Sequence, residues 1–331
     1  MKIVEGNNID INAWKDLTKH SSVATWFQTQ EAFAFFESLS FIESFAYAVE
    51  TEGQLKGVVV GYIQKDGGKI KQFFSKRAII LGGPLLANDI TDEELTFLLQ
   101  GLIKRIKKKT IYVETRNFVD FSCWRTTIEM CGFKYEPHLN FHVDTESVDI
   151  AQANVGKHRW RYIRISLRDG AGLIENPTIS QLEAFYAILQ DLYRTKVKTP
   201  LFPYEFFEML FKQKGARFFL VEYEGSVIGG SVCVCLEGKA VYEWFVCGNE
   251  NYRKGIRPSS VATWFGIDYS ARNGYPIFDL MGAGKPNEEY GVRDFKAEFG
   301  GKLVEQGRFV YVCKPLLFQI GKLGVRIMKR L

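Results

Sequence analysis

The chain has 331 residues, of which 46% are hydrophobic and 15% aromatic, and it carries a net charge of +5 at neutral pH. This length suits two domains with substantial cores, and the composition excludes a disordered or collagen-like chain. Because no run of about eighteen uncharged apolar residues occurs and the N-terminus lacks a secretory-signal pattern, a cytoplasmic protein is expected.

The first half of the chain has the pattern of one α+β unit. Thr29 can cap a first helix, and Thr91 with Glu94 forms the capping-box pattern of a second helix with a continuous apolar face. Glu-Gly and Asp-Gly-Gly turn sequences separate β-favouring runs between these helices. In chain order we expect a helix at 29–38, strands at 45–50, 55–64, 70–75 and 78–81, a helix from 91, a strand at 110–115, a short helix, and a strand pair around 132–143.

The second half repeats this order. Thr178 and Gln181 frame another capping box, which opens one helix. A second helix is expected from about Pro203 to Gln213, with Gly215 ending it. Two stretches also read alike, VETEGQLKGVVV at 49–60 and VEYEGSVIGGSV at 221–232, with an offset of 172 residues (221 − 49). The remaining expected elements are strands at 218–222, 227–235 and 240–246, a helix at 259–272, a strand at 276–281, a short helix near 294 and a last strand at 308–313. These repeats predict two copies of one unit, as domains 1–150 and 151–331.

The element order resembles the GNAT acyltransferase fold, and the tandem resembles the FemAB-like aminoacyltransferases that build peptidoglycan cross-bridges. The resemblance is carried by FDLMGAG at 278–284, by FKAEFGG at 295–301 and by the basic stretch KHRWRYIR at 157–164. It implies an α+β protein of two tandem GNAT-like domains, each with a mixed, mainly antiparallel sheet flanked by helices, and places the active site in the second domain.

Three residues near these motifs are predicted to be catalytic. An amine that attacks a carbonyl creates negative charge on oxygen, and Lys296 can donate to that oxygen; the resemblance implies a related role at the ester of an aminoacyl-tRNA. Asp279, in an otherwise apolar strand, could orient the amine or accept its proton, and Arg293 lies beside them in the chain. The alternatives are a solvated lysine and an aspartate that bonds turn backbone.

Substrate contacts are predicted at two places. Gly282 and Gly284 allow close approach of a ligand to the backbone, with Tyr290 in the loop beyond them and Trp244 as a wall, although core packing is the alternative for Trp244. In the basic stretch, Lys157, Arg161 and Arg164 share one helical face that attracts phosphate groups, unless the face is merely solvated. The tail from residue 315 is cationic and amphipathic, so contact with the inner membrane face is a further expectation beside packing on the protein.

The predicted function is N-acyl transfer, from aminoacyl-tRNA to an amine of a peptidoglycan precursor, with no cofactor. One alternative is an acetyl-CoA-dependent acyltransferase of a sugar or surface polymer, and another is a non-catalytic protein that binds an anionic ligand. The loop YRKGIRP at 252–258 departs from the phosphate-binding loop of CoA-dependent relatives in its spacing and in Pro258, which lacks a backbone donor. The six cysteines form no CxxC pair and no histidine lies at metal-ligand spacing, so no metal site is expected.

Overall fold

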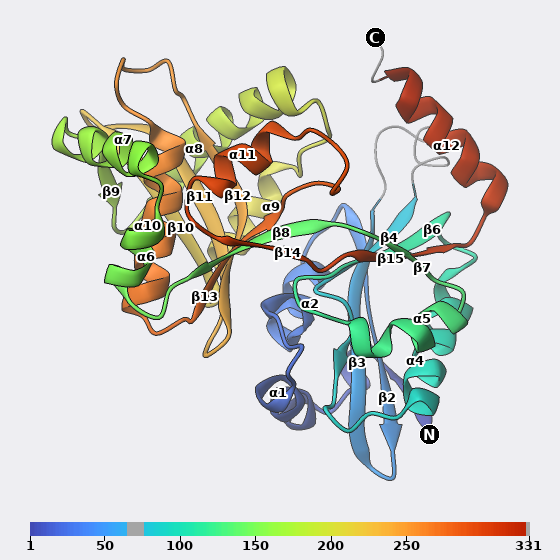
Figure 1. The fold of residues 1–331 in the computed structure, drawn as a ribbon. Helices are drawn as coiled ribbons and strands as arrows, with labels where there is room; N and C mark the ends of the chain where they lie inside the picture. Colours follow the sequence, from blue (N-terminus) through green and yellow to red (C-terminus); the bar gives the residue numbers. More distant parts are fainter. Residues whose placement is uncertain (65–75, 329–331) are drawn as a thin grey trace. The chain divides into compact units, whose positions relative to one another are not determined.

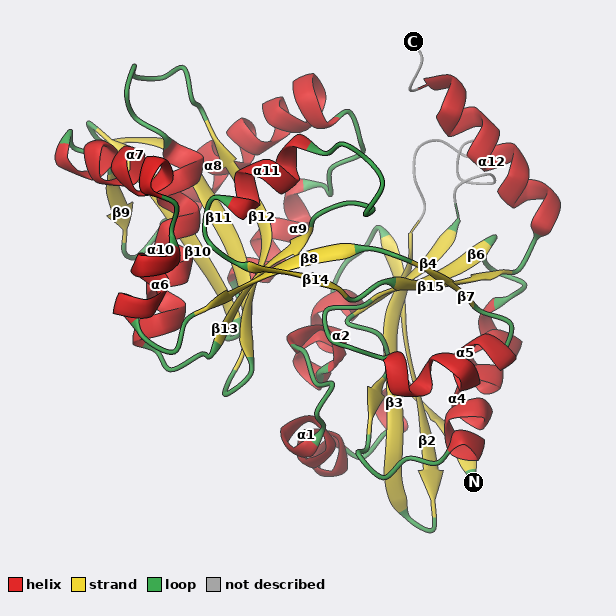
Figure 2. Cartoon of the chain, in the orientation of Figure 1, coloured by secondary structure: helices red, strands yellow, loops and turns green. Residues whose placement is uncertain are grey.

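The computed structural model describes residues 1–64 and 76–328, with side chains through residue 322 (Figure 1). The chain forms two compact units, Met1–Pro137 together with Glu305–Leu331, and His138–Val304. Each unit contains one sheet with helices on both faces (Figure 2), which confirms the predicted α+β class. The expected strand at 70–75 lies outside the described residues.

The first unit is built on a mainly antiparallel sheet with the strand order β1-β2-β3-β4-β6-β15-β7. Helices α1 and α2 cover one face and α4 and α5 the other (Figure 1). The predicted capping box is present at the start of α4, where Thr91 and Glu94 exchange hydrogen bonds of 2.9 and 3.2 Å. The strands are β1 Lys2–Glu5, β2 Ile42–Thr51, β3 Gln54–Gln64, β4 Arg77–Leu81, β5 Leu85–Leu86, β6 Tyr112–Arg116, β7 Lys134–Glu136 and β15 Arg308–Val312; the α-helices are α1 Ile11–His20, α2 Gln30–Glu37, α4 Asp92–Ile106, α5 Arg125–Met130 and α12 Pro315–Met328.

The second unit is built on a sheet with the order β14-β8-β13-β12-β11-β10-β9. Helices α6, α7 and α10 pack together on one face, while α8 and α9 bring an aromatic cluster to the other. The strands are β8 Leu139–Asp144, β9 Gly172–Ile174, β10 Ala216–Tyr223, β11 Ser226–Leu236, β12 Ala240–Gly248, β13 Ile277–Gly282 and β14 Lys302–Glu305; the helices are α6 Val148–Asn154, α7 Lys157–Arg168, α8 Ile179–Leu192, α9 Tyr204–Phe211, α10 Pro258–Arg272 and α11 Gly291–Ala297.

The two repeated stretches form equivalent hairpins. Glu52 and Gly53 connect β2 to β3 with φ angles of 52° and 80°, and Glu224 and Gly225 connect β10 to β11 with 49° and 74°. Two consecutive left-handed residues are typical of the turn type that matches the twist of antiparallel strands. Both hairpins also shift register at the same place, after Val49 and after Val221. The prediction of a duplicated unit is therefore confirmed.

The predicted domain boundary at 150/151 needs correction, because the two halves exchange strands. Strand β8 joins the second sheet, where it pairs with β13, and β15 returns to the first sheet between β6 and β7. The expected strand pair around 132–143 is thus divided between two sheets, and the expected last strand of the second half completes the first sheet. Alternation of side chains predicts a strand but does not tell which sheet it joins.

Helix α12 begins against the first unit. The ring of Phe318 meets Tyr112 edge-on at 5.2 Å, whereas Leu316 and Ile320 are 77% and 55% exposed. Among the described residues, no helix is long and apolar enough to cross a membrane. Two cationic residues of the tail, Lys329 and Arg330, lie outside the described residues. Membrane contact of the tail therefore stays a prediction, which co-sedimentation of the whole chain with anionic vesicles would test.

Candidate active site

The site forms where the parallel strands β12 and β13 stop pairing. Their ladder covers Ala240–Tyr242 and Ile277–Asp279, and each strand then continues without the other. Both strands carry an irregularity there: β12 shifts register against β11, and β13 shifts against β8 between Asp279 and Gly282. Met281 takes a left-handed φ of 57°, a strained conformation for a side chain with a Cβ. Such bulges and strained residues concentrate beside functional sites.

Lys296 is buried at this point. It lies on α11, is 8% exposed, and its Nζ donates a hydrogen bond of 2.8 Å to the carbonyl oxygen of Gly282. The alternative of a solvated lysine is therefore wrong. Burial lowers the pKa of Lys296 to about 8, against the opposing attraction of Glu243 and Asp279. The predicted residues Lys296, Gly282 and Asp279 are thus brought together.

Asp279 makes the contacts that were expected of a turn-binding aspartate. Its side chain is 1% exposed, and Oδ1 accepts a hydrogen bond of 2.6 Å from the backbone of Met281. Its other oxygen lies 3.4 Å from Asn140 Nδ2 and 3.4 Å from His142 Nε2. Both of these side chains come from the exchanged strand β8. Asp279 therefore stabilises the bulge at Met281 and also carries negative charge close to Lys296.

Glu243 is a site residue that the sequence analysis missed. It follows the last paired residue of β12 and is 4% exposed. Burial raises its pKa to about 7, while the positive charge of Lys296 favours the charged form. The signal was present in the sequence, since Glu243 is the one acidic residue of AVYEWFVC at 240–247. The same reasoning that selected Asp279 applies to it.

The other predicted residues of this region support the loop or the core. Arg293 donates 2.9 Å to the carbonyl oxygen of Ala283 and also bonds the carbonyl oxygen of Lys285. Gly284 has a φ of +79°, and a Cβ there would lie 3.0 Å from the ring of Tyr290. Trp244 packs edge-on against Phe206 with ring centroids 5.0 Å apart. Arg293 thus bonds loop carbonyl groups and Trp244 packs on a core ring. The catalytic role of Arg293 and the substrate contact of Trp244 stay predictions.

The helix N-terminus that could hold a phosphate group is occupied by the chain's own carboxylate. Helix α10 starts with Pro258, and the next amide, Ser259 N, donates 3.2 Å to Oε1 of Glu250. Glu250 also lies 4.0 Å from Arg257. A helix N-terminus attracts anions, and here a side chain already supplies one.

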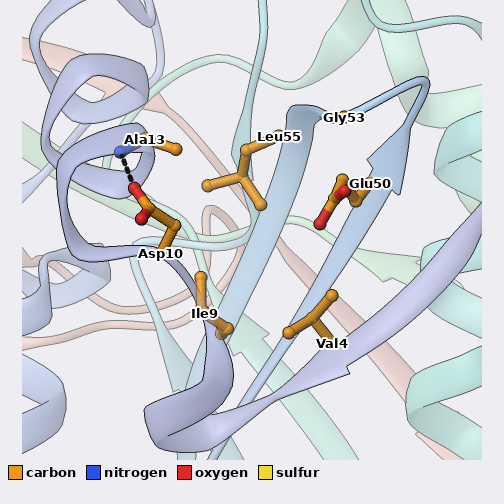
Figure 3. A pocket seen from close by; sticks show the side chains of 7 residues that line it. All are labelled: Val4, Ile9, Asp10, Ala13, Glu50, Gly53 and Leu55. Atoms are coloured by element: carbon orange, nitrogen blue, oxygen red, sulfur yellow. Dashed lines mark hydrogen bonds between the residues drawn. The ribbon is translucent and has the colours of Figure 1, made fainter.

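In the equivalent region of the first unit the two parallel strands do not separate. Strands β4 and β6 pair along the whole length of β4, from Arg77 to Leu81, without the early end seen in the second unit. Beyond them, the buried side-chain amide of Gln28 donates 2.9 and 3.0 Å to the carbonyl oxygens of Gly82 and Gly83. A hollow elsewhere in this unit (Figure 3) contains none of the predicted site residues; it is lined by Val4, Ile9, Asp10, Ala13, Glu50, Gly53 and Leu55. The described residues also contain no cluster of metal-ligand side chains.

The basic helix α7 presents its predicted cations to solvent. Lys157, Arg161 and Arg164 are exposed, while Ile163 on the opposite side is buried. The guanidinium of Arg257 adds to this surface, since it lies 5.6 Å from the ring centre of Tyr162, itself 42% exposed.

Comparisons with known proteins agree with this architecture. Residues 160–296, which lie in the second unit, match the family described as an acetyltransferase (GNAT) domain. The whole chain has the fold of the solved structure of FemX, with a TM-score of 0.74 at 15% identity over 97% of this chain and 99% of that one. This confirms the predicted FemAB-like tandem GNAT architecture.

Two further solved structures share the tandem fold. The C-terminal DUF2156 domain of a putative lysylphosphatidylglycerol synthetase from Agrobacterium fabrum has a TM-score of 0.58 at 14% identity, with 92% of each chain covered. A tandem GNAT protein from the clavulanic acid biosynthesis pathway has a TM-score of 0.58 at 10% identity, over 94% of this chain and 98% of that one. No curated protein matches the sequence.

Proposed function

We propose that the chain transfers an aminoacyl group from aminoacyl-tRNA to an amine of a cell-wall precursor. The observation that carries this proposal is the buried ammonium of Lys296 at the point where β12 and β13 separate. In acyl transfer the amine attacks the ester carbonyl, and negative charge develops on its oxygen. A cation in a site that excludes water stabilises that oxygen far more than one in solvent does.

The chemistry needs no covalent enzyme intermediate. The amine nitrogen forms the new C–N bond, the ester C–O bond breaks, and the departing ribose hydroxyl takes up the proton that the nitrogen loses. Lys296 contributes positive charge at the carbonyl oxygen, and Asp279 favours the charged form of Lys296. Orientation of the two substrates supplies the rest of the rate enhancement.

The donor is proposed on two features of the second unit. Glu250 already caps helix α10, and Pro258 removes one of its amides, which disfavours the pyrophosphate of a CoA donor. The exposed cations of α7 provide a surface for a polyanion such as tRNA. The name of the neighbouring lysylphosphatidylglycerol synthetase refers to an aminoacylated product, which is consistent with this choice. The acetyltransferase description of the matched family favours acetyl-CoA as the second candidate donor.

The test compares labelled aminoacyl-tRNA plus a peptidoglycan precursor with labelled acetyl-CoA. We expect label to move from the tRNA, and we expect Arg161→Ala/Arg164→Ala to weaken tRNA binding and to lower its salt dependence by about one unit of slope for each arginine removed. Arg194→Ala is the matched control, because Arg194 is an exposed arginine that lies outside helix α7 and pairs with Asp191. Transfer from acetyl-CoA alone would establish the second candidate, and transfer from neither donor would favour the binding-protein alternative.

A further inference from the structure

Glu243 is the buried charged group at the site whose role remains to be explained. It is the first residue of β12 beyond the parallel ladder and is 4% exposed. Within residues 1–64 and 76–322, neither of its carboxyl oxygens has a hydrogen-bond partner. Burial of an unbonded carboxyl group is unfavourable, so such a group in a native structure calls for a functional or compensating explanation.

Among the residues that the structure describes, Lys296 is the cation that acts on Glu243. Cys233 lies opposite Glu243 on β11. Tyr242, the residue before Glu243, pairs with Asp279 on β13, and Gly282, three residues farther along β13, accepts the hydrogen bond of Lys296. The strand register therefore brings Lys296 of α11 to the end of the ladder at which Glu243 lies. The other charged groups near Lys296 belong to β13 and β8: Asp279 acts on the lysine, and His142 lies 3.4 Å from Asp279. Lys296 itself is held by a hydrogen bond to a neutral carbonyl group. Of the two carboxylates, Glu243 exerts the larger influence on Lys296.

We propose that Glu243 keeps Lys296 protonated in this buried place, as a positioning residue that acts on the reaction through the lysine. An ammonium removed from water tends to lose its proton unless a negative charge lies close by. A neutral amine would offer the carbonyl oxygen a much weaker hydrogen bond than an ammonium. This inference rests on the proposed function only for its activity measurement, because the charge of Lys296 can be observed directly.

The direct test is a titration of Lys296 by NMR with ¹³C-labelled lysine, the signal being assigned with Lys296→Met. In the wild-type chain we expect the signal to titrate near pH 8, because burial lowers the pKa of Lys296 and the two carboxylates oppose that shift. In Glu243→Gln it should titrate at least about one pH unit lower, because the desolvation remains and the larger opposing charge is gone. An unchanged titration in a folded Glu243→Gln would overturn the inference, whatever reaction the protein catalyses.

The activity measurement is the pH profile of kcat/KM. If Lys296 acts as an ammonium, wild-type activity falls as pH rises through about 8, and the alkaline limb of Glu243→Gln moves to lower pH by the same shift as the NMR titration. Glu243→Asp keeps the charge and should restore much of the wild-type profile, which a purely structural role would not predict. Glu237→Gln, an exposed glutamate on the adjoining turn, is the matched control and should change neither measurement.

Discussion

Replacement of Lys296 by Met will lower kcat by about 10²–10³-fold with little change in the KM of the acceptor. Loss of one donor to a developing oxyanion typically has an effect of this size. Methionine has a similar length and suits a site that is 8% exposed, so the fold should persist. Steady-state kinetics at pH 7, where the wild-type lysine is largely protonated, provide the measurement.

The matched control for this change is Lys302→Met, at an exposed lysine of β14. It should leave kcat within about twofold of wild type, since solvated lysines contribute little. Thermal unfolding of both variants shows whether a loss of activity reflects a loss of fold. A folded Lys296→Met with nearly full activity would remove the lysine from the mechanism.

Gly300→Ala will destabilise the second unit by more than about 3 kcal/mol, a large effect for one methyl group. Gly300 has a φ of +77°, and a Cβ there would lie 1.8 Å from the carbonyl oxygen of Asn154 at the end of α6. The backbone of Glu298 also accepts 2.9 Å from Gly156, so the end of α11 is packed tightly against this part of the unit. This close approach holds the helix that carries Lys296, and it explains the glycine in FKAEFGG.

Gly274→Ala separates the two causes of strain in that prediction. Gly274 has a nearly equal φ of +72°, but a Cβ there would meet no atom within 4 Å. It should cost only about 1–2 kcal/mol, from the left-handed backbone alone. Urea unfolding gives the free energy of unfolding of the two variants. Equal destabilisation would show that the contact with Asn154 adds nothing to the cost of the left-handed backbone.

Local patterns in the sequence predicted much of the fold. The capping boxes at Thr91 and Thr178 and the two repeated hairpins depend on neighbouring residues, and all are present. Asp279 was found because a carboxylate in an otherwise apolar strand must be accommodated by a partner, whereas Lys296 was selected through the FKAEFGG motif. The strand exchange was missed because pairing between β8 and β13 joins residues far apart in the chain, for which alternation gives no information.

The site was predicted less completely than the fold. Arg293 and Trp244 were selected from their place in the chain, and in the structure their side chains contact a loop carbonyl group and a core ring. Their roles toward a substrate stay predictions. Glu243 was missed because its significance depends on the early end of the β12–β13 ladder, which only the three-dimensional register reveals. Likewise, the sequence showed a poor phosphate loop but not that Glu250 caps its helix.

The most direct test of the account is a structure of the chain with a non-hydrolysable 3′-aminoacylamino-adenosine, which carries the reacting end of the proposed donor. We predict that its carbonyl oxygen lies within hydrogen-bond distance of Lys296 Nζ, beyond the paired ends of β12 and β13. A ligand bound elsewhere, with the ammonium still bonded only to the carbonyl of Gly282, would contradict it.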